Sequence, residues 1–272
     1  MLNRGRLLLG AFYDCERAVD FAVRVAVVDV DDVRRRWRAA REAFLASPAP
    51  PPVAPEALDE TARAEVEEIL AAPLFRTALD GKPWSLAAVD ALSVATLQPV
   101  VNLGRVAVMR ERLAASALLP ILFPSTTELD VEPETGGGPT VSFLSSRGEL
   151  AVSGAQIHRA TDTAPIELTF RIEPRPNYVS VLAADDRLVL RNGHHRLLAA
   201  CAGGARTLPM VVVEGSVDAL AAHIDGLPPR TGVRAAMLAD FLEPSAAALD
   251  VELRPKRYAL RLRVERETLY AA

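Results

Sequence analysis

The chain has 272 residues, 50% of them hydrophobic and 24% charged, so it can bury a sizeable core and is not a disordered acidic or basic tail. Its formal net charge of −4 supplies no global positive field for nucleic acid or for an anionic membrane. Two cysteines exclude a disulfide framework, and no apolar run reaches the roughly 18 residues of a membrane-spanning helix. We expect a cytoplasmic α/β protein of one large or two modest domains.

The N-terminal part, residues 1–83, is predicted to be an α-rich extension. The β-branched stretch Val23–Val30 indicates a strand, and Asp31 and Asp32 then favour a helix over about Val33–Ala46. One face of this helix is apolar: Val33, Trp37, Ala40 and Phe44. The other face carries Arg34, Arg35, Arg36, Arg38 and Arg41, for which solvation is favoured over contact with DNA or RNA.

A proline-rich hinge at 48–55 separates this helix from a second one, predicted over 56–79 and stopped by Asp80-Gly81. A central domain, 84–215, is expected to follow. It begins with a buried strand over Leu86–Val101, and Asn102 then caps a helix to about Ala114. Further strands are predicted at Leu118–Phe123, Thr140–Leu144 and Ile166–Ile172, with an exposed loop at Glu128–Pro139.

The stretch from Tyr178 to Gly215 predicts a strand, loop, helix and strand. Tyr178–Leu182 and Arg187–Arg191 indicate a hairpin, Leu197–Ala202 a helix ended by Gly203-Gly204, and Leu208–Val213 an apolar strand. The unit is consistent with a parallel crossover. The last part, 216–272, predicts helices at 217–224 and 233–242. Strands at Leu249–Leu253 and Leu260–Val264 are expected to form an antiparallel hairpin.

The loop between the hairpin and the helix carries the most chemistry. Gly193 permits close backbone approach to an anion, and free N–H groups at the helix start point toward it. Arg196 adds a planar cation suited to phosphate oxygens, and His194 or His195 can donate a hydrogen bond or move a proton. The alternative is structural: Arg196 makes an internal ion pair and the two histidines complete a turn.

The segment Leu188–Gly204, with Leu208-Pro209-Met210-Val211-Val212 after it, resembles the ParB/sulfiredoxin superfamily. An upstream block agrees more loosely: Leu97-Gln98-Pro99, then Asn102, Arg105 and Leu118–Leu122. The resemblance covers about Leu86–Glu214 and is interrupted by an insertion at about 124–176. It implies a small mixed sheet with helices and a loop that binds nucleotide phosphates, here ATP, ADP or CTP with Mg²⁺.

The resemblance also implies roles for individual residues. The implied nucleotide-binding positions are Asn192, Gly193, His194, His195, Arg196, Gln98, Asn102 and Arg105. His195, His194 and Asp90 are the candidates for catalysis, and no side-chain metal site is expected. His194 stands where sulfiredoxins have their cysteine, which argues against sulfinic acid reduction. The Gly-His-His-Arg loop is closest to the free-serine-kinase-like branch, but Asn192 replaces the acid of that branch.

Two functions follow as hypotheses. The first is a nucleotide-phosphate-binding protein, a phosphotransferase or NTPase if catalytic; the second is a non-catalytic ParB-like scaffold that contacts protein or DNA. A homodimer is an open possibility. DNA is not favoured, because the C-terminal arginines are better explained by a solvated hairpin face or a subunit contact, and no membrane partner is expected.

Overall fold

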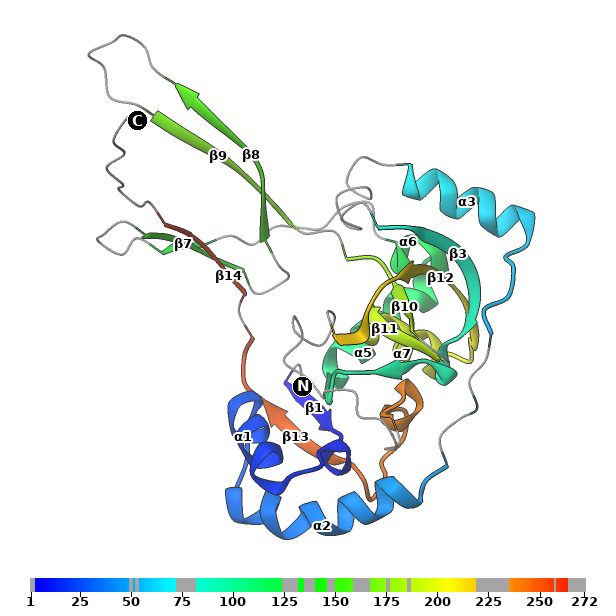
Figure 1. The fold of residues 1–272 in the computed structure, drawn as a ribbon, viewed down its shortest axis with the longest axis vertical. Coiled ribbons are helices and arrows are strands. Elements are labelled where there is room, and N and C mark those ends of the chain that lie inside the picture. Colours follow the sequence, from blue (N-terminus) through cyan, green and yellow to red (C-terminus); the bar gives the residue numbers. More distant parts are fainter. Residues whose placement is uncertain are drawn as a thin grey trace, which may run out of the picture. The chain divides into compact units, whose positions relative to one another are not determined.

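The computed structural model describes twelve stretches of the chain (Figure 1): 3–48, 51, 54–71, 82–123, 132–134, 140–145, 150–158, 167–174, 177–184, 187–218, 235–256 and 258–263. The chain forms two compact units. Unit 1 comprises Met1–Ser125 and Asn177–Arg254, and unit 2 comprises Thr126–Pro176 and Pro255–Ala272. Both contain strands and unit 1 also contains helices, so the protein is of mixed α and β structure.

A five-stranded sheet lies at the centre of unit 1. Its strands, in spatial order, are β3 (Trp84–Asp90), β12 (Thr207–Glu214), β10 (Ser180–Ala184), β11 (Arg187–Asn192) and β4 (Ala95–Thr96). The predicted hairpin is confirmed as the antiparallel pair β10–β11. β12 pairs in parallel with β10, so the crossover into β12 starts at β10 and runs through β11 and helix α7 (His194–Ala202), not directly from β11; β11 pairs in parallel with β4.

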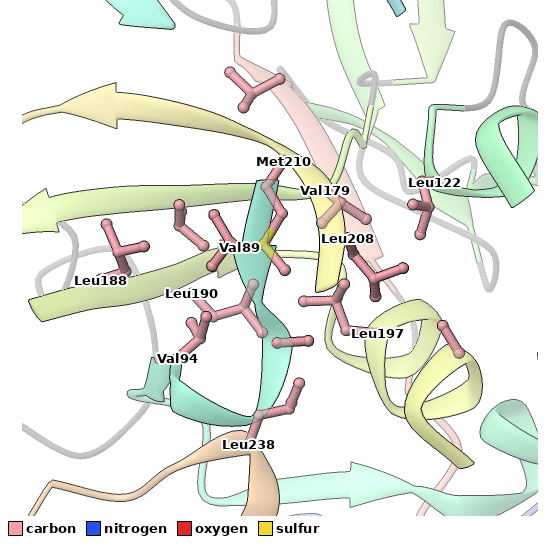
Figure 2. Packing of buried hydrophobic residues seen from close by; sticks show 14 of the residues in the cluster. Val89, Val94, Leu122, Val179, Leu188, Leu190, Leu197, Leu208, Met210 and Leu238 are labelled. Atoms are coloured by element: carbon pink, nitrogen blue, oxygen red, sulfur yellow. The ribbon is translucent and has the colours of Figure 1, made fainter. Parts of the chain in front are cut away.

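The main core packs α7 against this sheet. Side chains from β3, β11, β12 and α7 meet there (Figure 2), among them Leu190, Leu197, Leu208 and Met210, all at most 1% exposed. The alanines of α7 are small enough to let neighbouring elements pack close to the helix, and Ala199 is fully buried. Each fully buried leucine contributes about 1.5–3 kcal/mol, so this core holds the start of α7 firmly in place.

The termini of unit 1 meet in a second sheet of four strands. Its order is β2 (Ala26–Val27), β13 (Leu249–Leu253), β1 (Arg4–Leu7) and β5 (Val100–Asn102). The predicted C-terminal hairpin is therefore wrong. β13 pairs with β1, whereas β14 (Tyr258–Arg263) pairs with β7 (Thr140–Ser145) in unit 2. The alternation of apolar residues indicated the two strands β13 and β14, but it carried no information about which strands they pair with.

The N-terminal helices differ from expectation at their ends. Helix α1 (Cys15–Val25), capped by Asp14, occupies the first part of the strand predicted over Val23–Val30, because its Ala18, Val19 and Ala22 form a buried stripe. Helix α2 (Val30–Ala46) begins three residues earlier than predicted, where Asp29 accepts from the N–H groups of Asp31 and Asp32. Short 3-10 helix η1 (Leu9–Ala11) precedes α1, and helix α3 (Glu60–Leu70) follows α2.

The solvated face predicted for α2 is supported for three of its arginines by their ion pairs, whereas Arg41 is half-buried and its Nη1 donates to the carbonyl oxygen of Gly10. Arg34 contacts Glu16, and Arg35 and Arg36 both contact Asp32, so neighbouring carboxylates balance these charges. Helix α3 begins at Glu60 rather than at 56, because Asp59 caps it. The predicted end of this helix, including Asp80-Gly81, lies outside the described residues.

The long strand predicted over Leu86–Val101 is divided. The 3-10 helix η2 (Ala91–Ser93) separates β3 from β4, which lie in the same sheet, and the chain passes to the other sheet between β4 and β5. Helix α5 (Leu103–Ala115) is confirmed, with Asn102 as its N-cap. The strand predicted over Leu118–Phe123 is wrong: Leu118–Leu122 is helix α6, with Pro120 in the first turn, where no N–H is needed. Short apolar runs do not distinguish strand from helix.

The described part of unit 2 consists of strands. β7 and β9 (Glu167–Pro174) confirm two predictions, β8 (Leu150–His158) was not predicted, and β6 (Glu132–Glu134) lies within the predicted loop. They form the sheets β14–β7–β6 and β8–β9. In unit 1, 3-10 helix η3 (Leu238–Phe241) lies within the helix predicted over 233–242, while 219–234 is outside the described residues. Among the described helices none could cross a membrane.

Candidate functional site

The turn from β11 into α7 requires glycine at position 193. Gly193 is the N-cap of α7 and has φ +103°, and a Cβ added there would lie 2.7 Å from Cγ2 of Val179. Both the left-handed backbone and the close contact disfavour any side chain. Helix α7 begins at His194 rather than at the predicted Leu197, so His194, His195 and Arg196 form its first turn and not a loop before it.

His194 is directed into the protein. It is 7% exposed, and its Nε2 lies 2.8 Å from Oγ1 of Thr96 on β4. Burial above all, with smaller effects from His195 and Arg196, lowers the pKa of His194 from 6.5 to about 3. The imidazole is therefore neutral near pH 7 and cannot donate a proton as an imidazolium there. Its contact with Thr96 joins the start of α7 to β4.

His195 joins the start of α7 to the start of α5. Its half-buried ring accepts a hydrogen bond at Nε2 from the backbone N–H of Asn102, at 3.1 Å. In the neutral ring this contact assigns the proton to Nδ1. Oδ1 of Asn102 accepts from the N–H of Arg105, at 2.9 Å, and so caps α5. Two helix N-termini, each the positive end of a helix dipole, thus lie side by side.

Arg196 is a buried cation. It is 9% exposed, and its Nη1 donates to the carbonyl oxygen of Leu122 at 2.8 Å and more weakly to that of Ile121 at 3.4 Å. Nη2 donates to Oδ1 of Asn177. Burial lowers the pKa of Arg196 from 12.5 to about 10, so the guanidinium stays charged at pH 7. None of these partners carries a negative charge, and no carboxylate among the described residues forms an ion pair with Arg196.

The partners of Arg196 have a particular place in the chain. Leu122 lies just before residue 126, where unit 2 begins, and Asn177 is the first residue of unit 1 after it. The N–H of Val179 also donates to the Leu122 carbonyl, at 3.2 Å. Arg196 therefore holds together, within unit 1, the two segments between which unit 2 is inserted.

The remaining predicted phosphate-binding residues divide into two groups. Gln98 and Asn102 lie beside the histidines: Nε2 of Gln98 donates to the Val100 carbonyl at 2.6 Å, and its N–H donates to Thr96 Oγ1. Arg105 occupies the first turn of α5 and is half-buried, with a partner of its own. Asn192, also half-buried, ends β11 directly before Gly193. The structure thus brings both predicted blocks, 98–105 and 192–196, to one place.

Asp90 is not part of this group. Its Oδ1 accepts from the N–H of Leu92, and its Oδ2 accepts from Nε of Arg206 at 2.9 Å. It lies close enough to Cys201, at the other end of α7, to help raise the pKa of that thiol, although burial is the larger cause. This pKa, raised to about 11, keeps Cys201 a thiol at neutral pH. Asp90 therefore has no position from which to serve a group bound at the start of α7.

Sequence analysis missed Thr96 and Asn177. Thr96 is 2% exposed, and it is one of two hydroxyl residues, with Ser93, in the stretch predicted to be a buried strand. A polar residue at such a position must find a hydrogen-bond partner, which was an available signal. Asn177 gave no comparable signal, because its role depends on where the chain returns from unit 2.

The start of α7 has backbone N–H groups that suit an anion. The N–H groups of the first helical turn lack intrahelical acceptors, and no side chain caps them. Among the described residues, no cluster of three His, Cys, Asp or Glu side chains could hold a metal ion. No protein-family model, no curated protein and no solved structure matches this chain.

Proposed function

We propose that this protein binds a phosphate group of a nucleotide at the start of α7, and that its central domain is a member of the ParB/sulfiredoxin superfamily. The observation that carries the proposal is electrostatic. Arg196 is a nine-tenths-buried cation with no counter-ion among the described residues, in the first turn of a helix without a side-chain cap. A buried charge without a counter-ion is costly even where neutral oxygens accept its hydrogen bonds, and a bound phosphate would supply the missing negative charge.

The neighbouring helix strengthens the attraction. The Asn102 N–H contacts the His195 ring, so the positive end of α5 lies beside that of α7. The half-buried side chains of Asn192, His195, Gln98 and Asn102 supply the polar rim of this site. A nucleotide phosphate would accept hydrogen bonds from the first-turn N–H groups of α7. Since the rim has no carboxylate, Mg²⁺ would be held mainly by phosphate and water.

The arrangement favours binding over catalysis by the predicted residues. His194 is neutral and bonded to Thr96, and Arg196 positions the segments around Leu122 and Asn177. Phosphoryl transfer to a hydroxyl needs a carboxylate or another base near the acceptor. Asp90 lies beyond the far end of α7, so a catalytic function requires a base from another segment or from a partner.

Substitution of Asn102 tests the site without disturbing the fold. Asp at position 102 keeps the cap on α5, since a carboxylate also accepts from the Arg105 N–H, but it adds a negative charge where the two helices start. We expect ATP, ADP or CTP, with Mg²⁺, to raise the melting temperature of the wild type. Asn102→Asp should lower the affinity for this nucleotide by about tenfold or more. The melting temperature of the variant without nucleotide should equal that of the wild type or exceed it.

Asn102→Ser is the matched control, because serine caps the helix without adding charge. It should bind the nucleotide as the wild type does. The proposal is wrong if no nucleotide shifts the wild-type melting temperature, or if Asn102→Asp and Asn102→Ser bind equally well in calorimetry.

A second candidate function is a non-catalytic scaffold that binds protein or DNA. The observation that favours it is the internal use of the three side chains: His194 bonds to Thr96, His195 to Asn102, and Arg196 to two carbonyls and Asn177. Absence of nucleotide binding in the wild type, with a normal unfolding transition, would favour this function.

A further inference from the structure

One edge of the Arg196 guanidinium has no acceptor. Nη1 donates to the carbonyl oxygens of Ile121 and Leu122, and one N–H of Nη2 donates to Oδ1 of Asn177. In the part of the chain that the structure describes, nothing accepts from the Nε–H or from the second N–H of Nη2. These two N–H groups are parallel and form the free edge of Arg196. Such a fork matches two oxygens of a phosphate, and donors without acceptors are costly on a side chain only 9% exposed.

The free edge lies on the side of the guanidinium that is nearer to solvent. Nη1 donates to the carbonyl of Leu122, which has no exposed surface, whereas Nη2 donates to Asn177, which is exposed. The free edge includes the second N–H of that same Nη2. An anion that approaches from the side of Asn177 can therefore meet the free edge while the contacts of Nη1 remain in place.

The bonded side of Arg196 fixes the two segments that flank unit 2. Leu122 precedes the first part of unit 2 in the chain, and Asn177 is the first residue of unit 1 after it. The N–H of Val179 donates to the Leu122 carbonyl at 3.2 Å and so joins the same two segments directly. We refer to Leu122, Asn177 and Val179 as the junction. Arg196 therefore presents its free edge to a ligand and its other N–H groups to the junction.

We propose that an anion at the free edge of Arg196 and the junction stabilise each other. The coupling depends on the nucleotide site proposed above and adds a means of regulation, since occupancy of that site tightens the contacts between the segments that flank unit 2. The bonds to Leu122 and Asn177 hold the guanidinium in one orientation, so less side-chain freedom is lost when the ligand binds. An intact junction therefore increases the affinity for the ligand, and by linkage the ligand stabilises the junction by the same factor.

Asn177 positions the guanidinium without neutralising it. Its amide oxygen accepts from Nη2 but supplies no negative charge. Asn177→Asp keeps an acceptor there and adds a counter-ion within the chain. Without ligand this variant should therefore unfold at a higher temperature than the wild type, and its affinity for ATP with Mg²⁺ should be about tenfold lower or less in calorimetry. Gln156→Glu on β8 adds the same charge at an exposed position of unit 2, and it should leave both quantities unchanged.

Amide hydrogen exchange measures the junction itself. The N–H of Val179 reports its opening, because the acceptor of this group is the Leu122 carbonyl. In the wild type, saturating ATP with Mg²⁺ should slow exchange at Val179 about tenfold or more. In Asn177→Asp this exchange should be slow without nucleotide, since the carboxylate takes the place of the ligand's charge. The N–H of Glu56, which donates to the Ala88 carbonyl on β3, is the control and should exchange equally in all samples.

These measurements separate the coupling from nucleotide binding. A wild type that binds no nucleotide overturns both proposals. If the wild type binds nucleotide but Asn177→Asp binds it equally well, or if nucleotide leaves exchange at Val179 unchanged, the coupling is wrong and the nucleotide site stands. Equal slowing at Val179 and Glu56 also overturns the coupling, because it would reflect general stabilisation of the folded state by the ligand.

Discussion

The start of α7 and the hairpin β8–β9 differ in opposite ways from the usual pattern, in which apolar side chains are buried and polar ones are exposed. At the start of α7, polar and charged groups are buried: His194 and Arg196 are 7% and 9% exposed. In β8–β9, apolar groups are exposed, with Ile157 at 72%. Buried polar groups and exposed apolar groups are the informative exceptions in a folded chain. The first is the basis of the proposal that a phosphate group binds at the start of α7.

The largest expected effect compares a leucine of the α7 core with an exposed residue of β8. Leu197→Ala removes a fully buried side chain and should lower the free energy of unfolding by about 2–5 kcal/mol. Ile157→Ala should lower it by about 0.5 kcal/mol or less. Chemical denaturation of both variants measures the difference. Similar costs would mean that the exposed hairpin face is covered within the chain, and the comparison would fail.

A smaller effect concerns the glycine that starts α7. Gly193→Ala introduces a side chain at φ +103° and against Val179, and should cost about 2–3 kcal/mol. Gly204, which ends the C-terminal turn of the same helix at φ +93°, has open space around it. Gly204→Ala should therefore cost only the backbone strain, about 1 kcal/mol. Equal costs in urea titrations would show that the contact with Val179 contributes nothing.

The pH dependence of stability tests the burial of His194. Its pKa falls from 6.5 when unfolded to about 3 in the folded protein, so the unfolded chain binds the proton more readily. The stabilising contribution is complete above pH 6.5 and is lost as the pH falls toward 3, by at most about 1.4 kcal/mol per pH unit. His194→Gln removes this dependence. The difference in unfolding free energy between wild type and variant should change over this range; a constant difference would mean that the ring is accessible to water.

Sequence patterns predicted the secondary structure best where it is determined by residues close together in the chain. Asn102 and α5 were predicted together because the cap and the first turn lie within three residues of each other. The strands β10, β11 and β12 followed from short apolar runs between turn residues. The same logic failed at Leu118–Leu122, where a five-residue apolar run had no period to distinguish helix from strand. It also failed at Val23–Val30, where β-branched residues suggested a strand but α1 continued to Val25.

The residues of the candidate site also fall into those that the sequence identified and those that it did not. Gly193, both histidines and Arg196 were identified from their order in the chain. Their partners were not: Thr96 is 98 residues from His194, and Asn177 is 19 residues from Arg196. Asp90 was a plausible base in the sequence, but the antiparallel pairing of β3 with β12 places it opposite Thr207, after α7 has ended.

The amino-acid order by itself determined the elements around the start of α7, because turn, cap and helix preferences act over a few residues of backbone. It also indicated strand β9, but not its partner β8. Only the tertiary structure decided that Arg196 is buried among neutral oxygens and that β13 joins β1 rather than β14. These pairings depend on which surfaces are removed from water together, and that is a property of the folded chain and not of any short segment.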